Sequence, residues 1–186
     1  MASVTRTSAT IDDLRREKGK AELIAGRIVQ LMPTGRKPSR VAFRIARGLD
    51  DFAQAAGQGE AFADNTGYAV PELGSGRRSF APAASYHQGP LVGDDMRFVD
   101  GPPTFAVEVR SENDYGEAAE EAMAAKRADY LEAGTLVVWD VDLLAAGVRK
   151  HRSDSPDQPE VFSAGQEADA EPAVPGWRMA VDRIFA

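Results

Sequence analysis

The sequence predicts a mixed α/β (α+β) fold, in which helices flank a central mixed β-sheet. Three stretches of the chain carry this prediction. Residues 39–56 have apolar side chains at helical spacing, residues 104–111 (TFAVEVRS) alternate as a strand does, and residues 135–142 (TLVVWDVD) are almost continuously apolar. A strand, a helix and a second apolar strand in this order favour helices packed on a sheet over an all-β protein.

The first elements along the chain are expected to be short. Residues 1–10 are small and polar, which indicates a flexible tail, and Thr10 is a suitable N-cap for a short helix over 10–18. Gly26 divides AELIAGRIVQLM into two apolar runs, which is typical of a β-hairpin. The helix over 39–56 should end at Gly57.

Strands and one further helix are expected in the rest of the chain. GYAV, RSFAPAASY and TFAVEVRS have strand patterns, and residues 87–103 form a loop rich in proline and glycine. The second long helix should run from about Asp114 to Glu132, with Asp114 and Glu117 as a capping box and Gly134 as its stop. TLVVWDVD should be a strand covered on both faces, followed by a hairpin and a closing segment.

Composition restricts the class of protein. The chain has 186 residues, which suits a single domain over 1–186, and a formal net charge of −7, so any binding to nucleic acid requires a local basic patch. Cysteine is absent and histidine occurs twice, which argues against thiolate zinc sites, a Cys nucleophile and a Ser-His-Asp triad. The sequence has neither a signal-peptide core nor an apolar run long enough to cross a bilayer, so we expect a cytoplasmic protein without a membrane partner.

Glu108 is the best single candidate for chemistry, because it interrupts a strand of apolar residues. Period-two alternation places Glu108 and Arg110 on one face, so a plain ion pair is the competing interpretation and, for an isolated sequence, the favoured one. Lys126 shares a helix face with Met123 and Tyr130 and should point toward the sheet, where it could meet Glu108. Its competing interpretation is a lysine whose stem packs on the sheet.

Together, a carboxylate and a lysine at the end of a sheet suit metal-assisted phosphodiester cleavage. Carboxylates hold Mg²⁺, which activates the attacking water, and lysine stabilises the charge that develops on the phosphate. Such a site normally needs another carboxylate. A basic stripe is formed by Arg36, Lys37, Arg40, Arg44 and Arg47. It could bind a phosphate backbone or could be an ordinary solvated helix face, and the sequence favours neither interpretation.

Six segments resemble the Uma-two family of bacterial endonucleases, which belongs to the PD-(D/E)XK, restriction-endonuclease-like superfamily. The segments are ELIAGRIVQLMPTG, GYAV, FAPAASY, FAVEVRS, AAKRADYLEAGTLVVWDVD and AVPGWRMAVDRIF, and they extend from about residue 20 to the C-terminus. The resemblance implies a restriction-endonuclease-like core with the active site at one edge of the sheet. It also implies Mg²⁺ or Mn²⁺ as cofactor and nucleic acid, DNA in the first place, as partner.

The family pattern assigns roles to individual residues of this chain. Glu108 and Lys126 match the catalytic Glu and Lys, with Glu108 and Glu22 as metal ligands. Arg110 stands where the parent superfamily has its lysine. The resemblance implies that Arg110 and Tyr130 support the catalytic residues. The family His before the basic helix is replaced by Pro38.

Ala83 is the main departure from the family pattern. The family reads Pro-Asp where this chain reads Pro82-Ala83, so the metal-binding Asp is absent. We therefore expect a weak or inactive nuclease, with no metal bound in this chain. Two explanations stay open, an introduced Asp-to-Ala change in an active nuclease and a natural loss of catalysis.

Two functions therefore compete. The first is a divalent-metal-dependent endonuclease built on Glu108, Lys126 and Glu22. The second is a non-catalytic module on the same fold that binds nucleic acid or protein through the basic helix or the loop over 87–103. Since the chain is acidic with a single basic stripe, a homodimer is one way to embrace a duplex.

Overall fold

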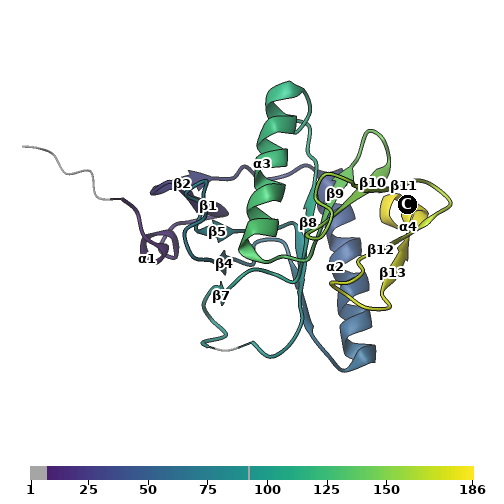
Figure 1. Cartoon of the computed structure of the whole chain (residues 1–186), viewed down its shortest axis with the longest axis horizontal. Coiled ribbons are helices and arrows are strands. Elements are labelled where there is room, and N and C mark those ends of the chain that lie inside the picture. Colours follow the sequence, from purple (N-terminus) through teal and green to yellow (C-terminus); the bar gives the residue numbers. More distant parts are fainter. Residues whose placement is uncertain (1–7, 92) are drawn as a thin grey trace, which may run out of the picture.

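A six-stranded mixed sheet forms the centre of the computed structural model, which describes residues 8–91 and 93–186 (Figure 1). The strands lie in the order β11-β10-β9-β8-β6-β3. β8 and β9 are parallel, and the other neighbours are antiparallel. The bounds are β3 Glu60–Ala63, β6 Ala84–His87, β8 Phe105–Val109, β9 Val137–Asp142, β10 Gly147–Arg152 and β11 Glu160–Phe162.

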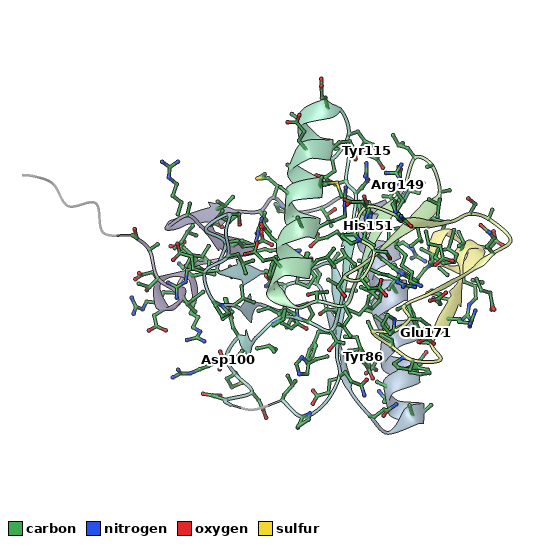
Figure 2. The ribbon with its side chains drawn as sticks, viewed as in Figure 1. Tyr86, Asp100, Tyr115, Arg149, His151 and Glu171 are labelled. Atoms are coloured by element: carbon green, nitrogen blue, oxygen red, sulfur yellow. The ribbon has the colours of Figure 1, made fainter. Side chains whose placement is uncertain are left out.

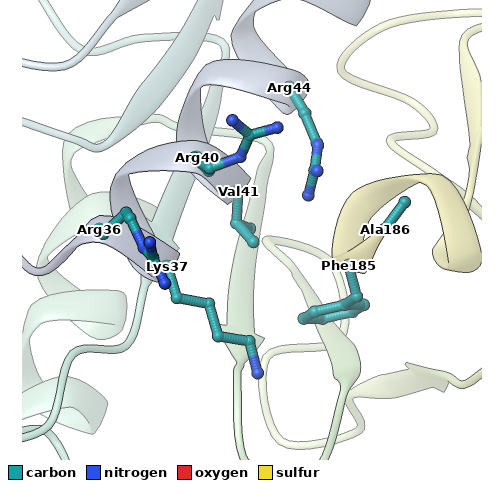
Figure 3. A pocket seen from close by; sticks show the side chains of 7 residues that line it. All are labelled: Arg36, Lys37, Arg40, Val41, Arg44, Phe185 and Ala186. Atoms are coloured by element: carbon teal, nitrogen blue, oxygen red, sulfur yellow. The ribbon is translucent and has the colours of Figure 1, made fainter.

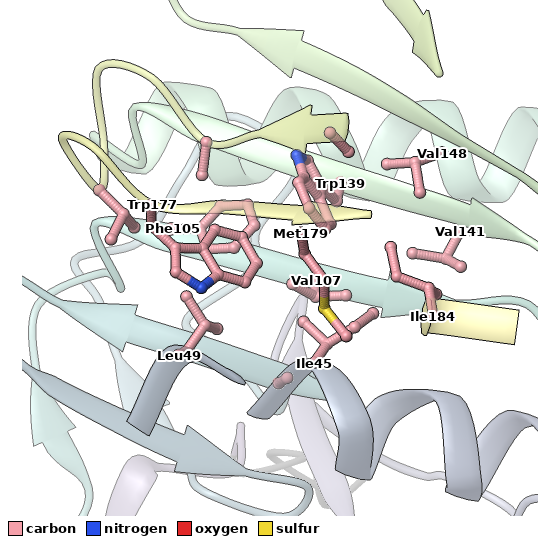
Figure 4. Packing of buried hydrophobic residues seen from close by; sticks show 14 of the residues in the cluster. Ile45, Leu49, Phe105, Val107, Trp139, Val141, Val148, Trp177, Met179 and Ile184 are labelled. Carbon is pink, nitrogen blue, oxygen red and sulfur yellow. The ribbon is translucent and has the colours of Figure 1, made fainter. Parts of the chain in front are cut away.

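Two long helices cover opposite faces of this sheet. α2 (Arg36–Ala56) packs its apolar stripe, including Ile45 and Leu49, against β8 and β9 side chains such as Val107 and Trp139 (Figure 4). α3 (Glu117–Ala133) lies on the other face, where Tyr130 packs in a smaller core. Alternate residues of β8 therefore face different helices, and Glu108 faces α3.

The connection through α3 explains why β8 and β9 are parallel. A helix that follows a strand and returns across the sheet allows the next strand to run in the same direction. All six residues of β9 are buried, as expected for a strand covered on both faces. Trp139 and Trp177 lie in the core together with Phe105, as the sequence indicates (Figure 4).

Shorter elements complete the fold on either side of the sheet. The hairpin of β1 (Ala21–Ile24) and β2 (Arg27–Gln30) turns through Ala25 and Gly26, both at positive φ, which is the geometry of a tight hairpin turn. None of the helices in the described ranges has the length and apolarity that crossing a membrane requires. The remaining elements are α1 Ile11–Leu14, β4 Tyr68–Ala69, β5 Ser79–Phe80, β7 Val99–Asp100, β12 Glu167–Asp169, β13 Arg178–Ala180 and α4 Val181–Phe185.

Several predicted boundaries differ from the observed ones. The first helix has its predicted Thr10 cap but ends at Leu14, and the expected flexible tail falls mostly on residues 1–7, outside the described residues. The first long helix begins at Arg36, three residues earlier than predicted. The strand predicted over 78–86 is interrupted, since β5 and β6 belong to different sheets. β3 was not predicted, because its four half-exposed residues give little pattern.

The predicted capping box of the second long helix is wrong. The N-cap of α3 is Gly116, and no side chain caps the helix. Asp114 instead accepts hydrogen bonds from the backbone N–H and the hydroxyl of Ser111, both at 2.7 Å. A local turn thus competes with the helix for this carboxylate, as is common for Asp.

Candidate functional site

Lys126 joins two carboxylates that come from different elements. Its Nζ lies 2.8 Å from Oε1 of Glu108 and 2.9 Å from Oε1 of Glu22. Glu108 belongs to β8, Lys126 to α3 and Glu22 to β1. Because α3 follows β8 and packs on the face to which Glu108 points, the predicted meeting of Glu108 and Lys126 is present in the structure.

Tyr130 supports Glu108 from the next turn of α3. Its hydroxyl donates a 2.7 Å hydrogen bond to the same oxygen of Glu108 that faces Lys126. Its ring stacks on Phe80 with centroids 4.0 Å apart, which fixes the ring against the sheet. Residues four apart on a helix share a face, so Lys126 and Tyr130 reach one carboxylate together.

Glu22 is more deeply buried than Glu108, with 2% of its surface exposed. Oε1 also accepts a 3.1 Å hydrogen bond from the backbone N–H of Ala81, and the Arg77 guanidinium pairs with Oε2. Arg77 in turn donates from Nε to Asp129 at 2.7 Å. The site therefore contains three carboxylates and two cations, which we call the Glu22–Lys126 cluster: Glu22, Arg77, Glu108, Lys126 and Asp129.

The charges of this cluster stabilise one another. Burial alone would raise the pKa of Glu22, but Lys126 and Arg77 outweigh it and hold that pKa below its usual value. Burial opposes the charge on Lys126, yet Glu108 and Glu22 keep the pKa of this ammonium above its usual value. Burial, and next Glu108, raise the pKa of Tyr130, so its hydroxyl stays a donor.

Ala83 lies beside the strand that carries Glu108. Its N–H donates a 2.9 Å hydrogen bond to the carbonyl of Val107, and Ala81, two residues earlier, holds Glu22. The side chain at position 83 is a methyl group and offers no ligand oxygen.

A divalent cation does not fit the donor set that these residues present. Within the described ranges, no group of three Asp, Glu or His side chains could hold a metal ion. Both oxygens of Glu22 and one oxygen of Glu108 already face cations or N–H and O–H donors. The Lys126 ammonium occupies the space between the two carboxylates.

Arg110 belongs to a different cluster, although it shares a strand face with Glu108. It donates to both oxygens of Asp140 at 2.7 Å and also pairs with Glu120. Arg127 pairs with Asp140 at 2.9 Å. We call these four residues the Arg110–Asp140 cluster.

The Arg110 guanidinium lies over the ring of Tyr115, which Figure 2 labels, at 5.7 Å from the ring centroid. The hydrogen bond to Asp140 raises the pKa of Arg110. Its recorded ion pairs therefore anchor α3 to the sheet and do not connect Arg110 with Lys126.

The predicted basic stripe lies on α2, on the opposite face of the sheet from α3. Lys37 donates to the carbonyl of Leu143 at 3.2 Å, and Arg44 donates to the carbonyl of Ile184 at 3.2 Å. Arg47 approaches Asp51 at 3.8 Å. A cavity beside this helix is lined by Arg36, Lys37, Arg40 and Arg44 (Figure 3).

Two members of the Glu22–Lys126 cluster were missed by sequence reasoning. Arg77 has no place in the predicted site, but it is buried and pairs with Glu22 and Asp129. Its partners are 55 and 52 residues away, so no local pattern signals the contact. Asp129 stands three residues after Lys126, and this helical spacing could have suggested it.

Comparison with known proteins identifies a family and a fold. A family model described as "Uma2: Putative restriction endonuclease" matches residues 9–182. A solved structure titled as a putative nuclease belonging to DUF820 from Anabaena variabilis ATCC 29413 superposes with a TM-score of 0.72 at 19% identity, covering 95% of this chain and 97% of that one. No curated protein matches.

The structural likeness establishes the fold alone, a mixed α+β fold, because the identity is too low to transfer residue roles. The family match covers nearly the whole chain. The chain therefore belongs to the Uma2 family of restriction-endonuclease-like proteins.

Proposed function

We propose that this chain has the hydrolytic site of a phosphodiester-cleaving endonuclease in an impaired form. The observation that carries the proposal is the convergence of Glu22 and Glu108, far apart in the sequence, on Lys126. Its Nζ lies 2.9 Å from an oxygen of Glu22 and 2.8 Å from an oxygen of Glu108. In an active site of this kind, the lysine stabilises the charge that develops on the phosphate oxygens as water attacks. Glu108 is our candidate catalytic carboxylate, and Tyr130 orients it.

Ala83 is the proposed cause of the impairment. We propose that an active member of the family holds Mg²⁺ or Mn²⁺ with a carboxylate at this position together with Glu108 and Glu22. With a methyl group there, Lys126 pairs with both remaining carboxylates, and we expect this chain to bind either ion weakly or not at all. Weak or absent cleavage of DNA follows from the same arrangement.

A cleavage assay on this chain and on Ala83→Asp tests the proposal. Supercoiled plasmid and single-stranded circular DNA are incubated with Mn²⁺ or Mg²⁺, and products are separated on gels. We expect no cleavage by the original chain and measurable cleavage by Ala83→Asp, which Glu108→Gln in the same background abolishes. Ala164→Asp, at an exposed position after β11, is a control for an added carboxylate away from the site and should stay inactive.

The other outcomes are equally informative. Cleavage by the original chain would show that the existing carboxylates suffice and that Ala83 is not a lesion. If Ala83→Asp folds normally but does not cut, the nuclease proposal fails for this chain. Circular dichroism and thermal unfolding establish that each variant is folded.

The alternative function is a non-catalytic binding module on the nuclease fold. The observation in its favour is the basic stripe of α2. Carbonyl groups hold its Lys37 and Arg44, and neither residue forms an ion pair with an acid in the described part of the chain. Binding of nucleic acid without cleavage by any variant would support it. We also propose a cytoplasmic location. We further propose that two copies of the chain bind a duplex as a homodimer, and elution as a monomer in size-exclusion chromatography with DNA would contradict this.

A further inference from the structure

An exposed aromatic side chain lies within the basic stripe of α2. At 100° per residue, Arg36, Arg40, Phe43 and Arg47 fall within about 60° of one another around the helix axis. Phe43 is 64% exposed, although the apolar side of α2 is buried in the core. A large apolar ring placed among three arginines on the outer face does not serve the packing of the fold.

The cavity beside this face is suited to phosphate groups. Its volume is about 400 Å³. It is lined by the last residue of the sequence, Ala186, and by four cations: Arg36, Lys37, Arg40 and Arg44 (Figure 3). Val41 and Phe185 form an apolar wall. Residues 36–47 contain five cations and no acidic residue. Among the described residues, the single ion pair recorded for these cations is the 3.8 Å approach of Arg47 to Asp51.

The cavity and the Glu22–Lys126 cluster lie toward the same end of the sheet. Lys37 reaches the carbonyl of Leu143, the residue that follows β9. Glu108 pairs in the sheet with Asp140, three residues before Leu143, which is about 10 Å along a strand. A strand of nucleic acid that crosses the carboxyl ends of β8 and β9 could touch both places.

We propose that the outer face of α2 binds a single-stranded stretch of nucleic acid, with a base stacked on Phe43 and phosphates held by Arg36, Arg40 and the adjoining cavity. Bases within a duplex are already stacked on their neighbours, so an exposed ring can take up only an unpaired base. The arginines supply the attraction to the backbone, and the ring supplies the preference for single strands. Binding of a single strand to α2 does not require nuclease activity. Only the delivery of this strand to Glu108 rests on the proposed function.

Fluorescence anisotropy with a labelled oligothymidine, in EDTA and at low salt, tests binding without any cleavage. We expect the chain to bind single-stranded DNA more tightly than the matching blunt duplex. Phe43→Ser should weaken single-strand binding about tenfold, because stacking of one base on an aromatic ring has roughly that effect. The double variant Arg36→Ala/Arg40→Ala should reduce the slope of log affinity against log salt by about 1.4. An oligouridine of equal length distinguishes DNA from RNA.

Matched controls lie elsewhere on the surface. Val161→Ser removes an exposed apolar side chain from β11, and Arg178→Ala removes an exposed arginine from β13. Neither should change binding by more than a small factor. The proposal is overturned by absence of binding, by equal or tighter binding of the duplex, or by equal effects of Phe43→Ser and Val161→Ser. The measurement here is binding and not cleavage. If the chain binds single-stranded DNA but does not cut it, even with the Ala83→Asp change, the nuclease proposal fails and the binding proposal stands.

Discussion

Two charged clusters link α3 to the sheet, and water reaches different members of each. In the Arg110–Asp140 cluster it reaches the outer acid Glu120, whose side chain is 45% exposed, and in the Glu22–Lys126 cluster it reaches the Glu108–Lys126 pair. In the Arg110–Asp140 cluster, the Asp140 side chain is fully buried and that of Arg110 is 2% exposed. In the Glu22–Lys126 cluster, the side chains of Glu108 and Lys126 are each 19% exposed. Both clusters begin from the same strand face, since Glu108 and Arg110 are two residues apart in the chain.

The charge balance of the clusters differs as well. Two arginines and two acids balance in the Arg110–Asp140 cluster, where Arg110 donates to both oxygens of Asp140. The Glu22–Lys126 cluster has three acids and two cations, and one oxygen of Glu108 has no partner among residues 8–91 and 93–186. We infer that the Arg110–Asp140 cluster serves stability. The Glu22–Lys126 cluster keeps the access and the excess charge that a reacting site needs.

Asp140→Asn should show the largest effect on stability. Asp140 is the recorded ion-pair partner of Arg127 and one of two for Arg110, so its loss leaves buried positive charge poorly compensated. We expect a decrease of about 3–5 kcal/mol in the free energy of unfolding. Chemical denaturation measures it, and Asp154→Asn, in an exposed pair with Arg152, is the control that should leave stability nearly unchanged.

Glu22→Gln should cost less, about 2–3 kcal/mol, because each of its cations keeps another carboxylate. Lys126 retains Glu108, and Arg77 retains Asp129. The same denaturation experiment measures the difference. A loss as large as that of Asp140→Asn would mean that the two clusters are equally structural, which contradicts the contrast drawn above.

The pH dependence of stability should distinguish Glu22 in a second way. Its pKa is lower in the folded protein than the usual 4.5, so its stabilising effect is present above pH 4.5 and is lost as the pH falls through the folded value. The thermal unfolding temperature of the original chain should therefore fall in acid. In Glu22→Gln it should depend less on pH over the same range. An unchanged acid profile in the variant would argue against the role of Lys126 and Arg77.

Tyr130→Phe should have the smallest effect, about 1 kcal/mol. The ring keeps its stack on Phe80, Glu108 keeps Lys126, and the partly exposed carboxylate can bind water in place of the lost hydroxyl. In the Ala83→Asp background, however, the same change should lower cleavage, whereas Tyr68→Phe, which loses a hydrogen bond to Ser85, should not. Equal effects of the two variants on cleavage would make Tyr130 a structural residue.

The sequence by itself determined the main elements and half of the candidate site. Helical and strand periodicity predicted α2, β8, α3 and β9, because long, strongly patterned segments bury one face wherever they pack. The family resemblance was confirmed over residues 9–182. The meeting of Glu108 and Lys126 followed from period two in a strand and period 3.6 in the helix after it, which also placed Tyr130 on the face of Lys126.

Tertiary structure alone decided the rest. Arg77 reaches Glu22 and Asp129 from a turn. Arg110 pairs with Asp140 and not with Lys126, because β9, which carries Asp140 30 residues further along the chain, lies beside β8. The roles given to Glu108, Lys126 and Ala83 stay predictions until cleavage is measured. Local spacing specifies which face a side chain takes, whereas the partner that a buried charge finds depends on which elements pack against that face.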